Sequence, residues 1–208
     1  NYLEQPYNSD LDFGTGDFCV MGWVKTSTLS DVILHRASAG GGFSATSSIY
    51  ASINGSGHLY FLTRDAALGS SVTGSESINS NTWRFVTIVR KSTGVFDLYV
   101  DGTLDVSTSS TVRDVSNSTG TLKLGVIGDG SDWLNGSLAL LRISATAPTA
   151  EQIAKIYNDE KVLFQENAQA TLYGTSDAVK ALAHDDDTGL LHVGTSAGRS
   201  VFNGLNRI

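Results

Sequence analysis

The chain of 208 residues has little of two residue types that often stabilise or direct a fold, with one cysteine and two prolines. Because Cys19 has no second cysteine to pair with, an internal disulfide is excluded. Cys19 stands in an alternating stretch, which favours a packed side chain over a reactive thiol. No apolar run approaches the roughly 20 residues of a membrane-spanning helix, so we expect no membrane insertion.

Positive charge is also scarce, since 14 Lys and Arg stand against 21 Asp and Glu and give a formal net charge of −7. Nucleic acids and anionic membranes gain nothing from such a surface, and we expect neither as a partner. Only 17% of the residues are charged, while glycine is abundant. The surface is therefore expected to consist largely of small polar residues.

What the sequence does have is short stretches in which β-branched or aromatic residues alternate with others. They cover residues 18–25, 32–36, 49–53, 59–63, 83–90, 96–100, 121–126 and 138–143. Clusters of Gly, Asn, Asp or Ser separate them, and Asp101-Gly102 is typical of a two-residue hairpin turn. Regular spacing without helices in between predicts an all-β fold, an antiparallel β-sandwich of the jelly-roll kind.

One helix is expected near residue 150. Thr149, with Gln152 three residues later, has the pattern of a capping box, and Ile153, Ile156 and Tyr157 would form an apolar stripe facing the sandwich.

Beyond residue 158 the composition changes, so we expect a connector with a strand at 170–173 and then a small C-terminal β segment. The predicted domains are thus 1–158 and 159–208. From the first and last residues we expect the chain to be a fragment of a longer protein.

Several motifs resemble one group in a consistent order. They are Phe18 with Trp23-Val24-Lys25, Trp83-Arg84-Phe85-Val86, Tyr99-Val100-Asp101-Gly102, Leu122-Lys123-Leu124-Gly125 and Asn135-Gly136-Ser137-Leu138. Residues 1–158 are identified as similar to the laminin-G-like, concanavalin A-like lectin/glucanase domains. The resemblance implies a concanavalin A-like sandwich and carbohydrate recognition, and it also implies that the first strand of the domain is missing at the N-terminus. Members often carry acidic residues where this chain has Ala139 and Leu140, which argues against an inherited acidic site.

Residues 179–195 resemble a single blade-like repeat of bacterial propeller sequences. One such repeat cannot bury its faces alone, and the segment has a sizeable apolar content for its length. We therefore expect residues 159–208 to assemble with other copies of the chain, as a homo-oligomer such as a trimer. A laminin-G-like module with such a tail resembles phage tail-fibre and other virion proteins, which implies a virion or extracellular location.

Catalytic patterns are not found in the sequence. Glycoside hydrolysis requires paired carboxylates, and no strand carries such a cluster. The four histidines are not at zinc spacing, and no nucleophile elbow is present. We expect no enzyme activity.

The candidate binding residues lie mostly in one polar loop. Asp129, Asp132 and Asn135 offer hard oxygens to Ca²⁺, although a polar turn explains the same residues without a metal. Trp133 between Asp132 and Asn135 offers an aromatic face for a pyranose ring, or else fills the core. Arg36 adds a guanidinium for sugar hydroxyls or a carboxylate, or else ends its strand in solvent.

Together these features predict a non-catalytic carbohydrate-recognising module of a phage tail fibre or virion appendage that attaches to cell-surface glycans of a host. The alternative is a structural module that decorates or spaces a fibre and binds no sugar. The two differ in whether the surface carries an aromatic-lined hollow.

Overall fold

The computed structural model describes residues 1–66, 68–164, 172, 178–204 and 206–208. The chain divides into two compact units, Asn1–Tyr157 and Asn158–Ile208. The strand expected at 170–173 falls almost entirely outside the described residues. Within the described part, every helix is too short or too polar to cross a lipid bilayer.

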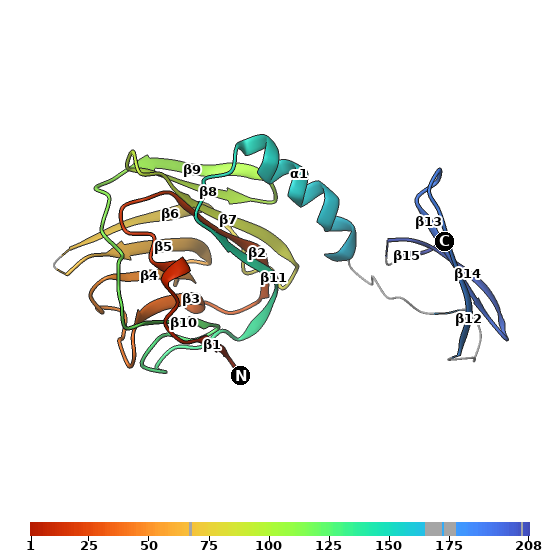
Figure 1. Ribbon diagram of the computed structural model, residues 1–208, viewed down its shortest axis with the longest axis horizontal. Helices are drawn as coiled ribbons and strands as arrows, with labels where there is room; N and C mark the ends of the chain where they lie inside the picture. Colours follow the sequence, from red (N-terminus) through yellow and green to blue (C-terminus); the bar gives the residue numbers. More distant parts are fainter. Residues whose placement is uncertain (67, 165–171, 173–177, 205) are drawn as a thin grey trace. The chain divides into compact units, whose positions relative to one another are not determined.

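The first unit is a sandwich of two antiparallel sheets (Figure 1). In spatial order, the six-stranded sheet consists of β1 (Leu3–Gln5), β10 (Gly120–Leu124), β3 (Asp31–Ser38), β4 (Ser48–Ile53), β5 (His58–Arg64) and β6 (Gly69–Ser77). The five-stranded sheet consists of β11 (Gly136–Ser144), β2 (Phe18–Thr26), β7 (Arg84–Arg90), β8 (Val95–Val100) and β9 (Thr103–Ser109). A short 3₁₀ helix, η1 (Ser9–Leu11), follows β1. The predicted fold class is confirmed.

Alternation along the strands builds the core between the sheets. In β4, Ile49, Ala51 and Ile53 belong to the central apolar cluster, whereas Tyr50 belongs to a separate cluster on the outer face. Burying an isoleucine side chain such as that of Ile49 or Ile53 stabilises the fold by about 1.5–3 kcal/mol. Since successive side chains point to opposite faces, the same strand that fills the core also presents Tyr50 outward.

The outer face of the five-stranded sheet is covered by helix α1 (Ala150–Glu160). Its capping box is present: the Thr149 N–H donates to Gln152 Oε1 at 2.9 Å, and the Gln152 N–H donates to Thr149 Oγ1 at 3.3 Å. Ile153 is fully buried, and the ring of Tyr157 stacks on Trp23 with centroids 5.8 Å apart. The predicted helix and its apolar stripe are confirmed.

The hairpin turn between β8 and β9 has the conformation that its sequence predicts. Asp101 has φ 49° and Gly102 has φ 77°, two successive positive values as in a type I′ turn. A Cβ atom on Gly102 would lie 3.0 Å from the side chain of Tyr157. Glycine at position 102 therefore permits both the positive φ of the turn and the close packing of helix α1 against it.

A buried arginine fastens the chain that leads into β2. Arg90 is fully buried and donates to the carbonyl oxygens of Gly14, Gly16 and Arg113. Its guanidinium lies 4.4 Å from the ring centroid of Phe18. Burial lowers the pKa of Arg90 to about 10, so the group stays charged at neutral pH.

In the first unit, the sequence patterns missed three strands. β1 has only three residues, and the polar strands β6 and β9 lack an aromatic-rich alternation. The alternation at 121–126 also ends earlier than expected, because β10 stops at Leu124 and Gly125 follows with φ 78°. Cys19 is buried, and burial raises its pKa to about 12, as expected for a packed thiol.

The second unit contains a four-stranded antiparallel sheet in chain order. Its strands are β12 (Val179–Asp185), β13 (Leu190–Thr195), β14 (Gly198–Asn203) and β15 (Asn206–Arg207), and the 3₁₀ helix η2 (Lys161–Phe164) precedes them. On one face of this sheet Val193 and Phe202 are buried, while Leu182 on the edge strand β12 is 66% exposed. The C-terminal β segment that the sequence predicts is present.

Candidate functional site

A hollow of about 380 Å³ opens on the outer face of the six-stranded sheet. It combines aromatic rings with small polar side chains. It is lined by Ser30, Phe43, Tyr50, Ser52, Ile53, Asn54, Tyr60, Thr73 and Asp132. These residues come from three adjacent strands, β4, β5 and β6, and from the loops around them. Ser30 and Asn54 lie at the end of the sheet where Asp31 pairs with Ile53, whereas Phe43 lies in the β3–β4 connection, which leaves from the opposite end.

Strand register places the floor of the hollow. Ser52 of β4 pairs with Tyr60 of β5, and Tyr60 pairs with Thr73 of β6. Residues that are directly opposite in an antiparallel sheet share a face. The floor is therefore one row across three strands, a tyrosine between two hydroxyl side chains.

Tyr50 forms the centre of an aromatic cluster beside that row. Its ring meets Phe43 edge-on with centroids 5.2 Å apart, and it meets Tyr60 at 6.3 Å. Burial, with the charge of Asp132 nearby, raises the pKa of Tyr50. Since Tyr50 is almost buried whereas Phe43 is 44% exposed, Phe43 offers the more accessible ring face to a ligand.

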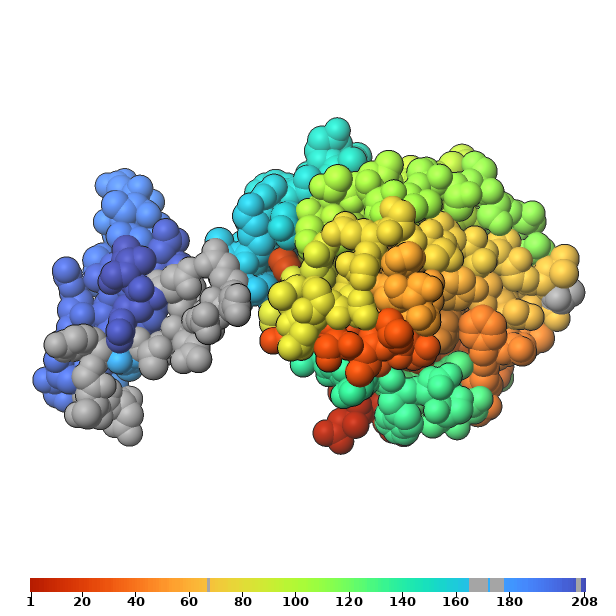
Figure 2. Space-filling view, turned by 180° about the vertical axis from the view of Figure 1, so that it is seen from behind, coloured from red at the N-terminus to blue at the C-terminus, as the bar shows by residue number. Residues whose placement is uncertain are grey.

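Two loops meet above the sheet to form one wall. A Cβ atom on Gly128 would collide with the carbonyl oxygen of Gly41, so glycine lets the two backbones touch. Figure 2 shows the loop before β11, in green, against the orange surface of the β3–β4 connection. The Gly128 N–H also donates to Nδ1 of His35 at 2.9 Å, and burial lowers the pKa of His35 to about 4. A neutral imidazole therefore holds this loop on the sheet.

The turn that carries Asp132 is a short hairpin. The Ile127 N–H donates to the Asp132 carbonyl, and Val126 bridges to Trp133. Asp129 accepts the N–H and the hydroxyl of Ser131, and these bonds lower its pKa. Hydrogen bonds within the turn thus account for part of its polar composition.

Of the residues predicted to bind sugar, Asp132 alone lines the hollow. Asn135 lies at the start of β11, where its N–H donates to the buried Asp31 and its carbonyl accepts from Thr26. Trp133 is 46% exposed and meets Tyr2 edge-on at 5.6 Å. The Trp133 side chain therefore does not fill the core. Its ring contacts the N-terminal segment of the chain through Tyr2.

Arg36 has a structural role at the far end of β3. It is 1% exposed and donates to the carbonyls of Val115 and Asn117 and to the carboxylate of Asp12. A guanidinium so enclosed is not a solvated strand end, and it offers no donor to a ligand in solution. We leave Arg36 out of the candidate site.

The calcium prediction receives no further support from the geometry. In the described ranges, no three His, Cys, Asp or Glu side chains converge as a metal site would require. The predicted set contains two carboxylates, and Asp129 already accepts from Ser131. Calcium at Asp129, Asp132 and Asn135 stays a prediction.

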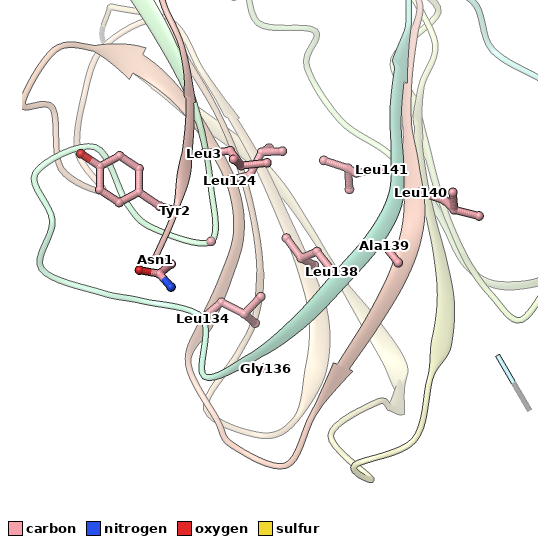
Figure 3. Close-up of a pocket in the computed structure, with 11 residues that line it drawn as sticks. Asn1, Tyr2, Leu3, Leu124, Leu134, Gly136, Leu138, Ala139, Leu140 and Leu141 are labelled. Atoms are coloured by element: carbon pink, nitrogen blue, oxygen red, sulfur yellow. The ribbon is translucent and has the colours of Figure 1, made fainter. Parts of the chain in front are cut away.

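A second hollow of about 500 Å³ lies between β1 and β11. Figure 3 shows Leu138 and Leu141 of β11 facing Leu3 and Leu124 across it. Apart from Asn1 and Tyr2, the residues around it are leucine, alanine or glycine. It lacks the ring of hydroxyl partners that a sugar needs, so we place the candidate site in the hollow of the six-stranded sheet.

Sequence reasoning missed Phe43, Tyr50 and Tyr60. The signal for the two tyrosines was present, because Tyr50 alternates with Ile49 and Ala51 and therefore faces outward. No pattern in the glycine-rich loop identified Phe43, whose position depends on how the β3–β4 connection folds over the sheet.

The first unit is thus a sandwich of two antiparallel sheets, with a hollow on one outer face. The sequence profile of the concanavalin A-like lectin/glucanases superfamily matches residues 2–154. The chain belongs to this superfamily. No curated protein is similar enough in sequence to count as a relative.

Solved structures share the fold at low sequence identity. The heptameric SAP-like pentraxin from Limulus polyphemus is 16% identical with a TM-score of 0.57, over 75% of each chain. The Ruminococcus gnavus IT-sialidase CBM40 bound to α2,3-sialyllactose is 10% identical with a TM-score of 0.58, over 74% of this chain and 98% of that one. The binding domain of Paraclostridial Mosquitocidal Protein 1 is 15% identical with a TM-score of 0.59, and the match covers all of this chain but 55% of that one.

Proposed function

We propose that the chain is a non-catalytic carbohydrate-recognising module, and that its sugar site is the hollow on the outer face of the six-stranded sheet. The observation that carries this proposal is the combination of the Phe43 and Tyr60 rings with the carboxylate of Asp132 in one open hollow. A pyranose has an apolar face that packs on an aromatic ring and a rim of hydroxyls that need polar partners.

Polar partners surround the rings. Asn54 uses its side-chain oxygen to accept the N–H groups of Ser56 and His58, which leaves its NH₂ group as a donor. Thr73 adds an exposed hydroxyl, which can both donate and accept, whereas Ser52 is almost buried and its hydroxyl hydrogen-bonds to Tyr50. Asp132 is the sole carboxylate in the lining, whereas glycoside hydrolysis uses two, about 5–9.5 Å apart. This supports binding without catalysis.

The test is a glycan array probed with the full chain and with two variants. We expect the chain to bind a defined subset of glycans and Phe43→Ala to lose that signal. The matched control is Leu104→Ala, which removes an exposed apolar side chain from β9 of the other sheet. A folded chain that binds no glycan contradicts the proposal and favours the fibre module without sugar binding.

The proposed setting is a phage tail fibre or other virion appendage, where the module would attach to host surface glycans. The support is the resemblance of the last unit to a single propeller-like repeat following a laminin-G-like sandwich. Immunogold electron microscopy of intact virions with an antibody to this chain tests the location. Label on the tail fibres is the expected result, and label absent from the particles contradicts it.

Self-association through residues 159–208 is part of the same proposal. Val179 and Leu182 on β12 are 47% and 66% exposed, and β12 is an edge strand of its sheet. Exposed apolar edge strands readily pair with other chains. Sedimentation velocity is expected to show an oligomer for the intact chain and a shift toward monomer for Leu182→Glu, with Leu104→Glu as control. A monomeric intact chain contradicts this part of the proposal.

A further inference from the structure

The charge distribution around the candidate site is one-sided. Apart from the two tyrosines, Asp132 is the one lining residue with an ionisable side chain. Its charge reaches the ring of Tyr50, whose pKa it helps to raise. The whole chain has a net charge of −7, so the long-range field has the same sign as the local one.

His58 lies two residues before Tyr60 on β5 and is not among the lining residues. Two other basic side chains near the site are engaged elsewhere. His35 lies behind Tyr50 with its ring centroid 5.6 Å away, and it is neutral at pH 7 because burial lowers its pKa to about 4. Lys123 donates to the Gly128 carbonyl at 3.0 Å and lies 3.7 Å from Glu4, beneath the loop. Neither supplies positive charge to the hollow.

Arg64 shares the outer face but lies too far along its strand. It is four residues from Tyr60 on β5, which corresponds to about 13 Å of strand. Its Nη1 lies 3.6 Å from where a Cβ on Gly69 would stand, at the start of β6. Thr73, which lines the hollow, is four residues further on in β6. The guanidinium therefore lies beside Gly69, the partner of Arg64 in register, and Arg64 is not among the lining residues.

We infer that the site selects glycan ends without negative charge, such as neutral hexoses, and rejects sugars that carry a carboxylate. This inference rests on the proposed function. A neutral sugar brings hydroxyl donors to the acceptor-only carboxylate of Asp132. A uronic or sialic acid brings a second carboxylate, and the hollow has no guanidinium or ammonium to pair with it.

The experiment compares matched sugar pairs that differ by one carboxylate. Immobilised glucose and glucuronic acid, galactose and galacturonic acid, and lactose and 3′-sialyllactose are probed with the full chain at 20 mM and 300 mM salt. We expect the neutral member of any bound pair to bind at least about fivefold more tightly at low salt, and the gap to narrow at high salt because exposed charges are screened.

Two variants identify the source of the selectivity. Asp132→Asn is expected to narrow the neutral-to-acidic ratio at least about threefold at low salt. Asp10→Asn, which removes an exposed carboxylate within η1 and outside the lining, is expected to leave the ratio unchanged. A ratio that is unchanged in Asp132→Asn overturns the role of Asp132.

The outcomes separate this inference from the proposal beneath it. If the acidic member of a pair binds as tightly as the neutral one or more tightly, the charge inference is wrong while sugar recognition stands. If no member of any pair binds and the chain is folded, both are wrong. Tryptophan fluorescence checks folding, because Trp23, Trp83 and Trp133 all lie in the sandwich.

Discussion

The two outer faces of the sandwich carry similar residues and put them to different use. On the five-stranded sheet, Trp23 and Phe85 are neighbours in register and helix α1 covers them with Tyr157. On the six-stranded sheet, Tyr50 and Tyr60 are covered in part by two loops. An outward aromatic residue is therefore enclosed where a helix covers it, and the sheet face keeps a hollow open to solvent where only loops cover it in part.

The largest effect is expected on the sealed face. Trp23→Ala removes a side chain that is 2% exposed and packs on both Phe85 and Tyr157. Such a truncation costs about 3–5 kcal/mol. Urea unfolding followed by the fluorescence of Trp83 and Trp133 measures it. A loss below about 1 kcal/mol would show that α1 does not seal this face in solution.

The next effect lies beneath the open face and depends on pH. The folded state holds the pKa of His35 near 4, below its usual 6.5. The unfolded chain therefore binds the proton more readily, so stability is lost as pH falls below about 6.5 and the loss levels off below 4. The resulting loss in the free energy of unfolding amounts to about 3 kcal/mol in total, of which about 2 kcal/mol appears between pH 7.5 and 5.

Unfolding of the wild type and His35→Gln at several pH values measures this contribution. The variant should show a shallower decline of stability between pH 7.5 and 5, whereas His184→Gln, at an exposed histidine of the second unit, should decline like the wild type. Equal slopes in all three chains would mean that the imidazole is not enclosed as described.

On the open face itself the effect should appear in affinity. Phe43→Ala removes an exposed ring from the loop wall, so its stability cost is expected to be below about 1 kcal/mol. Loss of stacking should weaken binding of a sugar found on the array by about tenfold, or ~1.4 kcal/mol. Titration calorimetry and urea unfolding of the same sample give both numbers. A variant that is strongly destabilised but binds normally would reverse the contrast between the faces.

The smallest effect concerns calcium at the turn beside the hollow. If Asp129, Asp132 and Asn135 bind Ca²⁺ with a Kd of roughly 0.1–1 mM, 1 mM of the ion stabilises the fold by about 0.4–1.4 kcal/mol. Melting curves in chelator and in calcium should then differ for the wild type and coincide for Asp129→Asn. Identical curves for the wild type remove the prediction.

The sequence predicted the sandwich because alternation and turn chemistry are local signals. The Asp101-Gly102 turn and the Thr149–Gln152 capping box were identified from a few residues each, since each is satisfied within its own segment. Arg36 was misjudged for the opposite reason. Its partners Asp12, Val115 and Asn117 come from distant segments, and no periodicity shows that they converge.

The candidate site was found only in part for a related reason. Alternation shows that Tyr50 and Tyr60 leave the core, but it does not show whether a helix or a loop lies above them. Asp132 was identified from its polar loop, while Phe43 depends on the contact between the two loops at Gly41 and Gly128. The composition of a loop does not specify such a contact.

The pairing of β1 with β10 has a consequence for biosynthesis. Leu3 is the partner of Leu124, so the first strand has no place in its sheet until some 120 further residues have left the ribosome. At about 5–20 residues per second this wait is on the order of ten seconds. During this interval β1 is an unpaired, partly apolar strand of the nascent chain.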